Sequence, residues 1–430
     1  MGKKELKPCQ QPLTGVIEVP GDKSISHRAV ILGSLATGTT KVRNFLDGED
    51  CMRTVTIFQS LGVKIEKDEK TLLIHGKGVK ALTEPKAPLY FGNSGTTARL
   101  MIGVLAGLPL FTTVYGDPSL TKRPMDRVVT PTRQMGANFD GRENSSYLPL
   151  AIRGGGLTGI SYQLPVKSAQ VKSAVLLAGI LADGMTEVVE QAETRNHTEN
   201  MLQAFGANVN KDENSIIVKG KQELLATDIY VPGDISSAAF FFAAAAIVPG
   251  SNLTLKNVGL NETRTGIIDV LQIMGVPITI ANQQIIGGEK IGDITISKAN
   301  LTSATIEGDL VPKLIDEIPI IALLATQAEG TTIIRDAAEL RVKETDRIAA
   351  VVDVLTTLGA NIEATDDGMI IHGKTPLTGG YVRAYDDHRI AMMIAIASRI
   401  TSESVFLDDE ASIAISYPNF FADLEKAQQE

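Results

Sequence analysis

Apolar residues gather in short, alanine-rich runs along this chain, and a polar cluster opens each run. Each run predicts an apolar helix. The longest run, Ala238–Val248, has 11 residues and is closed by Pro249-Gly250. It is too short to span a bilayer, so it predicts a buried helix. The polar clusters lie near Ser24, Thr96, Ser168, Ser236, Asp316 and Asp387, at spacings of 68 to 80 residues.

A second pattern follows each of the first five clusters: an apolar residue, a glycine, Ala or Val, and then a strand-like stretch. It is typical of a helix that ends at glycine. Each repeat therefore predicts a helix, a glycine turn, a strand, a second helix and one or two strands. In the third repeat these are residues 171–181, Gly184, 186–190, 197–205 and 208–219. The five patterns are Leu61-Gly62-Val63, Met135-Gly136-Ala137, Phe205-Gly206-Ala207, Met274-Gly275-Val276 and Leu358-Gly359-Ala360. The sixth repeat lacks the pattern and ends near Ala422.

The two halves of the chain also match. The stretch from Val19 to Ser24 recurs 212 residues later, from Val231 to Ser236, with Ile235 in place of Lys23. Six repeats thus group into two halves of three. A tandem solenoid is the alternative, but units of about 70 residues exceed the 20–50 typical of solenoids. The length of 430 residues fits two to four domains.

Composition limits the partners. The net charge of −9 argues against nucleic acid or an anionic membrane, so any anion site must be a local basic cluster. The two cysteines, Cys9 and Cys51, have no metal-ligand spacing, and the five histidines form no metal motif. We therefore expect no metal. The start of the chain lacks the apolar stretch of a signal peptide, so we expect a cytoplasmic protein.

Several helix starts carry basic residues, and a helix start attracts anions through its free N–H groups. Lys23 and Ser24 open the first helix, and Arg28 would share a face with Ser24. The stretch Gly92–Arg99 resembles an anion nest. The alternative for each start is an ordinary helix cap, and Asp316 would be such a cap by default. Other starts carry Arg123, Ser168, Gln170, Arg195, Lys343, Glu344, Arg347, His388 and Arg389, with Lys343 and Arg347 expected on one helix face.

These motifs, in this order, resemble those of the EPSP synthase family, the 3-phosphoshikimate 1-carboxyvinyltransferases, over essentially the whole chain. The resemblance implies an α/β fold: a two-domain inside-out α/β barrel of six βαβαββ repeats, three per domain, with helices buried and sheets outside. One domain would comprise residues 21–231, and the other residues 1–20 plus 232–430. The active site would lie in the cleft between them, and the protein would be a monomer.

The reaction that this resemblance implies joins phosphoenolpyruvate to shikimate 3-phosphate without a cofactor. The 5-hydroxyl of shikimate 3-phosphate adds to the enolpyruvyl carbon, and a tetrahedral intermediate then loses phosphate. By the same resemblance, Asp316 would be the base, Glu344 an acid/base, and Lys23 would touch both substrates. Shikimate 3-phosphate would be bound by Lys23, Ser24, Arg28, Ser168, Ala169, Gln170, Arg195, Asp316 and Lys343. Phosphoenolpyruvate would be bound by Lys23, Gly95, Arg123, Gln170, Glu344, Arg347, His388 and Arg389.

Three positions depart from the better-known branch of the family and favour its second branch. Ala169 stands where that branch has serine, Arg195 lies in a stretch that replaces a Ser/Tyr pair, and Ile415 replaces a lysine. Two alternatives remain: an enolpyruvyl transferase acting on UDP-N-acetylglucosamine, and a silent scaffold that binds phosphorylated ligands. The first usually has Lys-Asn at Lys23-Ser24 and a reactive cysteine in the loop that here spans Gly116 to Arg123. Against the second stands the presence together of Lys23, Arg123, Asp316, Glu344 and Arg347.

Overall fold

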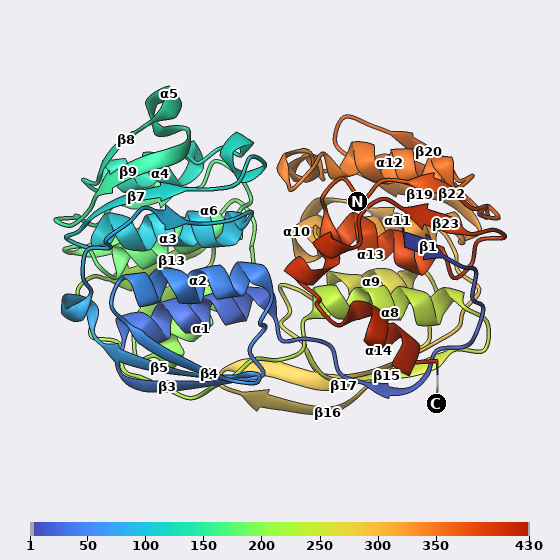
Figure 1. Cartoon of the computed structure of the whole chain (residues 1–430), viewed down its shortest axis with the longest axis horizontal. Coiled ribbons are helices and arrows are strands. Elements are labelled where there is room, and N and C mark those ends of the chain that lie inside the picture. Colours follow the sequence, from blue (N-terminus) through green and yellow to red (C-terminus); the bar gives the residue numbers. More distant parts are fainter. Residues whose placement is uncertain (1–3, 429–430) are drawn as a thin grey trace. The chain divides into compact units, whose positions relative to one another are not determined.

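The computed structural model describes residues 4–428, which fold as two compact units (Figure 1). The N-terminal unit comprises Gly21–Val231 with Ile286–Gly288. The C-terminal unit comprises the chain up to Pro20, Pro232–Ile285 and the chain from Glu289 onward. Each unit has its own hydrophobic core, and no residue belongs to both cores. Each unit is therefore described by itself.

Three apolar helices form the centre of each unit. All 13 residues of α8 are buried, as are all residues of α11 and α13. A helix that is apolar on every side is stable only when it is covered on every side. The sheets provide that cover, so the helices lie inside and the sheets outside. The central helices are α1 (Lys23–Leu35), α3 (Gly95–Gly107) and α6 (Ala169–Gly179) in the N-terminal unit, and α8 (Ile235–Ile247), α11 (Ile318–Thr326) and α13 (His388–Ala397) in the C-terminal unit.

A second helix in each of the first five repeats packs with one face inward. These helices are α2 (Glu49–Ser60), α4 (Asp126–Gln134), α7 (His197–Ala204), α9 (Gly266–Ile273) and α12 (Arg347–Thr357). Each ends two residues before one of the glycines that defined the repeat. All five glycines have φ between 84° and 111°, which side chains rarely tolerate. The repeat pattern therefore marks a backbone requirement.

The described strands form six sheets. In the N-terminal unit the strands are β3 (Thr37–Arg43), β4 (Lys64–Asp68), β5 (Thr71–Lys77), β6 (Leu89–Tyr90), β7 (Phe111–Tyr115), β8 (Asn138–Gly141), β9 (Tyr147–Arg153), β10 (Ser161–Gln163), β11 (Met185–Val189), β12 (Val209–Asp212), β13 (Ser215–Lys219) and β14 (Ile229–Tyr230). In the C-terminal unit they are β1 (Lys4–Leu6), β2 (Thr14–Ile17), β15 (Asn252–Gly259), β16 (Ile278–Ile286), β17 (Glu289–Ser297), β18 (Thr305–Ile306), β19 (Gly330–Ile334), β20 (Asn361–Ala364), β21 (Met369–Gly373), β22 (Gly380–Val382) and β23 (Val405–Leu407). Short helices are η1 (Val79–Ala81), η2 (Leu120–Lys122), α5 (Arg142–Ser145), η3 (Gly308–Leu310), α10 (Val311–Leu314), η4 (Ala338–Val342), η5 (Ala411–Ile415) and α14 (Phe420–Lys426).

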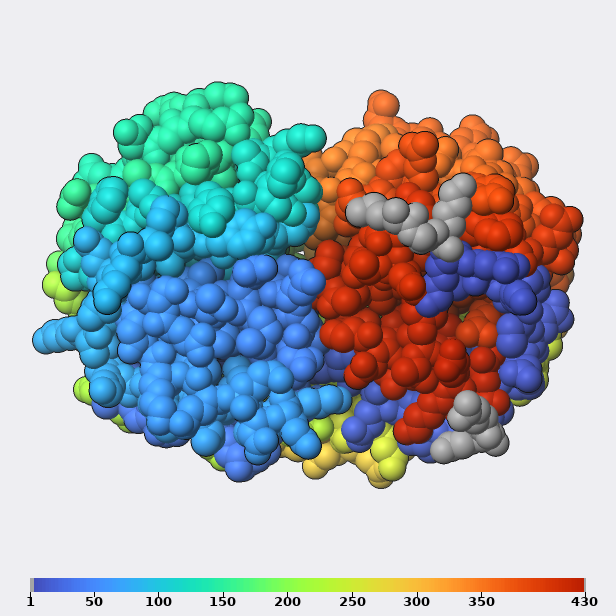
Figure 2. Space-filling view, in the orientation of Figure 1, coloured from blue at the N-terminus to red at the C-terminus, as the bar shows by residue number. Residues whose placement is uncertain are grey.

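Strands from distant parts of the chain close each unit. The order β14-β3-β5-β4 places the last strand of the N-terminal unit beside its first, in parallel. In the C-terminal unit β2 pairs in parallel with β15, and β1 pairs with β23 in antiparallel fashion. Figure 2 shows the segment that carries β1, in dark blue, on the surface against the red C-terminal part of the chain. The first strands thus join the sixth repeat to the fourth.

The predicted repeats agree closely with these elements. The third repeat forms α6, β11, α7, β12 and β13 at almost the expected bounds. The sixth repeat, which lacks the glycine pattern, forms only η5 and the short α14 after β23. Its three-stranded sheet, β1-β23-β22, includes the strand that begins the described chain.

The two matching Val-Pro-Gly-Asp stretches occupy equivalent places in the two units. A Cβ on Gly21 would lie 2.0 Å from the carbonyl oxygen of Asn44 and 3.0 Å from Val231. A Cβ on Gly233 would lie 3.0 Å from Val19. Each glycine therefore leaves room for a second segment of its own unit to pack closely against it. That segment contains Val231 for Gly21 and Val19 for Gly233. Asp234 N–H also donates to Pro20 O at 2.8 Å.

The close packing of α3 on α6 generates a stability prediction. A Cβ on Gly103 would lie 2.3 Å from the carbonyl oxygen of Ala174, a backbone atom that cannot rotate away. We expect Gly103→Ala to lower the free energy of unfolding by about 1–3 kcal/mol, because overpacking outweighs the better helix propensity of alanine. Urea unfolding would measure the change.

Gly33→Ala in α1 is the matched control. Its Cβ would meet only side-chain atoms of Ile74 and Thr40, at 3.1–3.3 Å. We expect this variant to keep the wild-type stability more nearly than Gly103→Ala does. Equal losses in the two variants would contradict the close approach of α3 and α6.

Candidate active site

The start of α1 places Lys23 beside a carboxylate of the next helix. Asp22 caps α1 by accepting from Ile25 N–H at 2.8 Å, so the cap is Asp22 and not Ser24. The Lys23 ammonium forms an ion pair with Asp50, at the start of α2. Both side chains keep some exposure, 16% and 10%. Lys23 is therefore held in place and still accessible.

Arg28 is turned toward the interior of the N-terminal unit. Its guanidinium donates to Thr198 Oγ1 and Ser173 Oγ, each at 2.6 Å, and to Ser24 O at 2.9 Å. The residue is only 3% exposed. Ser24 and Arg28 were expected to lie on one face of the helix. In the structure the Arg28 guanidinium contacts Ser24 through its backbone carbonyl. Arg28 links α1 to α6 and α7.

The start of α3 lies beside two guanidinium groups. Ser94 caps this helix by accepting from Thr97 N–H at 3.1 Å. A Cβ on Gly95 would lie 3.1 Å from Arg99 Nη1 and 3.3 Å from Arg123 Nη1. Arg123 also donates to Asn93 Oδ1. Gly95 therefore leaves room for two cations next to a helix N-terminus, which is a setting suited to an anion.

The start of α6 joins the same group. Ser168 is the cap, as expected, with Ala169 as the first helical residue. Gln170 accepts from Arg99 Nη1 at 2.6 Å and donates to Thr96 Oγ1 at 3.0 Å. Arg195 lies just before α7, and its side chain is partly buried. The starts of α3 and α6 are thus linked by Arg99 and Gln170.

In the C-terminal unit, Arg347 is the centre of an ionic cluster. Its side chain is 1% exposed and forms ion pairs with Asp387 at 2.7 Å, Glu344 at 2.6 Å and Asp316 at 3.2 Å. Burial alone would lower the pKa of Arg347, but the carboxylates of Asp387, Glu344 and Asp316 outweigh it and raise that pKa above its ordinary value. Arg347 is therefore a permanent cation that fixes three carboxylates.

Asp316 and Lys343 differ from the sequence-based expectation. Glu317, not Asp316, occupies the cap position of α11, and the Asp316 carboxylate instead contacts Arg347 and Lys343, the latter at 3.4 Å. Lys343 lies in extended backbone ahead of α12, which begins at Arg347. The expectation that Lys343 and Arg347 share a helix face is wrong, and Asp316 is what joins them. His388 and Arg389 open α13 and are buried, behind the Asp387 cap.

The second copy of the Val-Pro-Gly-Asp motif contacts this region. Asp234 caps α8, and Arg264 donates to Ser236 Oγ at 2.7 Å and pairs with Asp234 at 3.4 Å. Ser236 in turn donates to Glu317, which is fully buried and adjoins Asp316. The copy lacks a lysine and arginine of its own, but a buried arginine from another segment supplies the charge.

His27, in α1 of the N-terminal unit, is a residue to which sequence reasoning assigned no role. It is fully buried, and its Nδ1 lies 2.8 Å from Thr54 Oγ1. Thr54 contacts Thr97 at 3.1 Å, and Thr97 contacts the Ser94 cap. This chain connects α1, α2 and the start of α3. The only signal in the sequence was its place between Lys23 and Arg28.

Across residues 4–428, no cluster of His, Cys, Asp and Glu has the arrangement of a metal site. In the same range no helix has the length and apolar character needed to cross a membrane.

Buried helices within outer sheets, with cations and carboxylates at helix starts, place the protein in the class of inside-out α/β folds. Comparison with known proteins is more specific. The family model of EPSP synthase (3-phosphoshikimate 1-carboxyvinyltransferase) matches residues 8–424. A protein of that name from Oceanobacillus iheyensis is 60% identical over 425 residues, 99% of each chain. One from Bacillus subtilis is 56% identical over 417 residues, 97% of each.

Solved structures agree. An EPSP synthase from Acinetobacter baumannii superposes with a TM-score of 0.88 at 43% identity, covering 98% of this chain and 97% of that one. The enolpyruvyl transferase NikO from Streptomyces tendae has a TM-score of 0.79 at 17% identity, covering 98% and 96%, and so shows the fold alone. The chain belongs to the EPSP synthase family. The resemblance and the inside-out α/β fold predicted from the motifs are confirmed.

The burial of His27 makes stability depend on pH. Burial lowers the pKa of His27 well below the usual 6.5, and the charges of Lys23 and Arg28 lower it further, while Asp22 opposes them. Below about pH 6.5 the unfolded chain therefore binds a proton that the folded chain does not. As far as His27 is concerned, the folded state therefore keeps its full stability above pH 6.5 and loses up to about 1.4 kcal/mol per pH unit below it.

We expect His27→Gln, which stays neutral, to lose less stability than the wild type between about pH 7.5 and about pH 5. Urea unfolding at both pH values would measure the two losses. Parallel losses would show that His27 titrates equally in both states.

Proposed function

We propose that the charged residues described above act on phosphoenolpyruvate and shikimate 3-phosphate. The reaction transfers the enolpyruvyl group of phosphoenolpyruvate to the 5-hydroxyl of shikimate 3-phosphate, and it yields 5-enolpyruvylshikimate 3-phosphate and phosphate. The family match over residues 8–424 and the names of relatives at 54–60% identity support this activity. The observation that carries the assignment of residues is the cluster of carboxylates and cations around Arg347.

The chemistry requires a base, an acid and several cations. A base removes the proton of the 5-hydroxyl, an acid protonates the methylene carbon of phosphoenolpyruvate, and phosphate leaves from a tetrahedral intermediate. Asp316 is the proposed base and Glu344 the proposed acid/base. Both are ion-paired to Arg347, which holds each carboxylate in a defined orientation. Lys23, held by Asp50, is the proposed contact to both substrates.

Cations at the helix starts are proposed to bind the anionic groups, because charge-assisted hydrogen bonds are the strongest that a phosphate can form. For phosphoenolpyruvate, Arg123 next to Gly95 is the central residue. For shikimate 3-phosphate, Ser168 and Arg195 lie on neighbouring elements of the N-terminal unit. The full proposed sets are Lys23, Ser24, Arg28, Ser168, Ala169, Gln170, Arg195, Asp316 and Lys343 for shikimate 3-phosphate, and Lys23, Gly95, Arg123, Gln170, Glu344, Arg347, His388 and Arg389 for phosphoenolpyruvate.

The protein is further proposed to act as a monomer in the cytoplasm, with small molecules as its substrates. Transfer to UDP-N-acetylglucosamine is not favoured, because the named relatives are 3-phosphoshikimate 1-carboxyvinyltransferases.

A direct assay tests the reaction. Purified protein supplied with phosphoenolpyruvate and shikimate 3-phosphate is expected to release phosphate, which a colorimetric assay follows. Protein supplied with UDP-N-acetylglucosamine instead is expected to release none. Phosphate release with UDP-N-acetylglucosamine and none with shikimate 3-phosphate would contradict the proposed reaction.

The role of Asp316 makes a separate prediction. Asp316→Asn keeps the size of the side chain but removes the base, so we expect kcat to fall by about 100-fold or more. The two KM values should change far less, because the lost interaction belongs to the transition state. Steady-state kinetics measure this split, with thermal unfolding to show that the variant is folded.

Asp353→Asn serves as the control for Asp316→Asn. Asp353 is an exposed carboxylate on α12 that accepts from Tyr385 OH at 2.6 Å. Its loss should leave kcat unchanged. If Asp316→Asn behaves like this control, Asp316 is only a structural partner of Arg347.

A further inference from the structure

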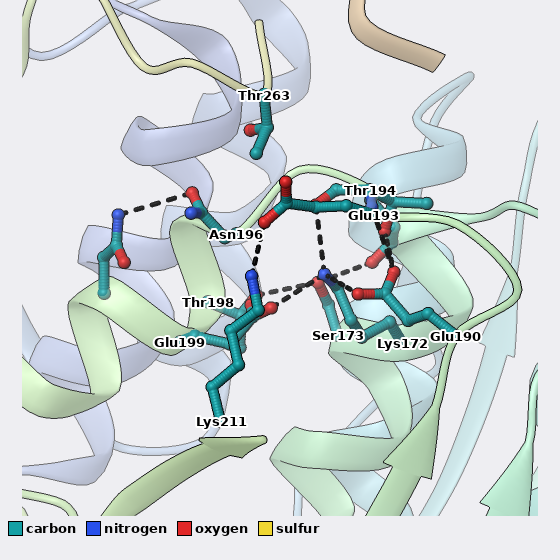
Figure 3. A network of polar contacts seen from close by, with 12 residues as sticks. Lys172, Ser173, Glu190, Glu193, Thr194, Asn196, Thr198, Glu199, Lys211 and Thr263 are labelled. Atoms are coloured by element: carbon teal, nitrogen blue, oxygen red, sulfur yellow. Dashed lines mark hydrogen bonds and ion pairs between the residues drawn. The ribbon is translucent and has the colours of Figure 1, made fainter. Parts of the chain in front are cut away.

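Lys172 is a buried lysine that none of the roles above includes. Its side chain is 0% exposed, and its ammonium lies 2.7 Å from Glu199 Oε1 and 3.0 Å from Glu190 Oε2. The ammonium also donates to Thr194 O at 3.2 Å. Figure 3 shows these partners converging on it. Lysine is rarely buried completely, because losing its hydration is costly unless partners replace the water.

The partners of Lys172 close the loop that leads to Arg195. Glu190 follows β11, and its Oε1 accepts from both the N–H and the hydroxyl of Thr194, at 3.1 and 2.5 Å. Its other oxygen is bound by Lys172. Both ends of the segment from Glu190 to Thr194 are thus fixed on one ammonium. Arg195 is the next residue, so the position of its backbone depends on this attachment.

The helix after the loop has its own anchor. In α7, Thr198 contacts Ser173 at 2.7 Å, and Arg28 donates to both hydroxyls. Without Lys172, α7 would still be held to α6 by these contacts (Figure 3). The loop before α7 has other contacts: Glu190 N–H donates to Asn214 O at 2.8 Å, Gln191 Nε2 donates to Pro165 O at 3.5 Å, and Glu193 pairs with Lys211. Thr194, the residue next to Arg195, is instead bound by Glu190 and Lys172. Lys172 therefore acts on the loop more than on the helix.

A second lysine offers a comparison on the same loop. Lys211 pairs with Glu193, and these side chains are 45% and 47% exposed. An exposed pair of this kind fixes little, because water competes and both side chains lose freedom. Lys172 and Lys211 thus differ in burial while both carry a positive charge to one loop (Figure 3).

We propose that Lys172 is a positioning residue for shikimate 3-phosphate: with Glu190 it holds the loop in the form that presents Arg195 to the substrate. The inference rests on the proposed function of Arg195. Lys172 does not touch the substrate. It lowers the cost of binding because Arg195 is already ordered before the anion arrives. A buried ionic group adds little net stability, but it can fix one geometry.

The test compares Lys172→Met with Lys211→Met. Isothermal titration calorimetry measures the Kd for shikimate 3-phosphate, and steady-state kinetics measure kcat and the KM for phosphoenolpyruvate. Lys172→Met is expected to raise that Kd by about tenfold or more, with kcat and the KM for phosphoenolpyruvate changed by less than about threefold. Lys211→Met should leave all three unchanged. A Kd unchanged in Lys172→Met would overturn the proposal.

A milder variant covers the case in which Lys172→Met does not fold, since it leaves two buried carboxylates without their cation. Glu190→Gln keeps the pair between Lys172 and Glu199 and removes the negative charge of Glu190, which binds both Lys172 and Thr194. It is expected to raise the same Kd by a smaller factor. If it folds with a wild-type Kd, the loop does not depend on this network and the proposal fails.

A double-mutant cycle tests the route through Arg195. If Lys172 acts by positioning Arg195, adding Lys172→Met to Arg195→Ala should raise the Kd for shikimate 3-phosphate by less than about twofold further. Fully multiplicative effects would overturn the proposal. A wild-type Kd in Arg195→Ala would overturn it too, together with the role of Arg195. Phosphate release by the wild-type protein would still support the proposed reaction in that case.

Discussion

Complete burial of the central helices is the constraint on which the rest of each unit depends. A helix such as α8, buried at all 13 positions, has no side on which a polar residue can reach water. The charged residues of the central helices therefore lie in their first two turns, near the starts where backbone N–H groups need partners in any case. The same arrangement places caps, cations and carboxylates close together at the starts of α1, α3 and α6, and again at those of α11 and α13. The burial of the central helices thus accounts both for the core of each unit and for the clustering of charged residues at the helix starts.

Each unit contains a buried cation that organises acidic partners, but the two differ in chemistry. Arg347 contacts three carboxylates through a planar guanidinium that is charged at any relevant pH. Lys172 contacts two carboxylates and a backbone carbonyl through a single nitrogen. The three nitrogens of a guanidinium can bind separate carboxylates in different directions. A single ammonium nitrogen holds all its partners close to one atom. Arginine therefore suits a cluster of reacting groups, and lysine suits the closing of a loop.

The sequence predicted the repeats well because they reflect strict local requirements. Apolar runs identify the central helices, and Gly206 or Gly359 identifies a turn with positive φ that other residues tolerate poorly. Side-chain contacts were predicted less well. Asp22 rather than Ser24 caps α1, and Lys343 lies outside the helix that begins at Arg347. Other contacts join segments far apart in the chain, such as Leu46 N–H with Ser26 Oγ and Arg28 with Thr198, and no local pattern encodes them.

The two copies of the Val-Pro-Gly-Asp motif show how one backbone serves two purposes. Asp22 and Asp234 both cap their helices, by accepting from Ile25 N–H and Ser236 N–H, and Gly21 and Gly233 leave room for Val231 and Val19. The next position differs: Lys23 remains partly accessible and pairs with Asp50, whereas Ile235 is buried. In the second copy Ser236 accepts from Arg264 and donates to Glu317, the neighbour of Asp316. The first copy can therefore offer a cation to a ligand, while the second fixes the turn that carries a carboxylate. The two copies share the Val-Pro-Gly-Asp backbone, and the side chains around each copy give it a different role.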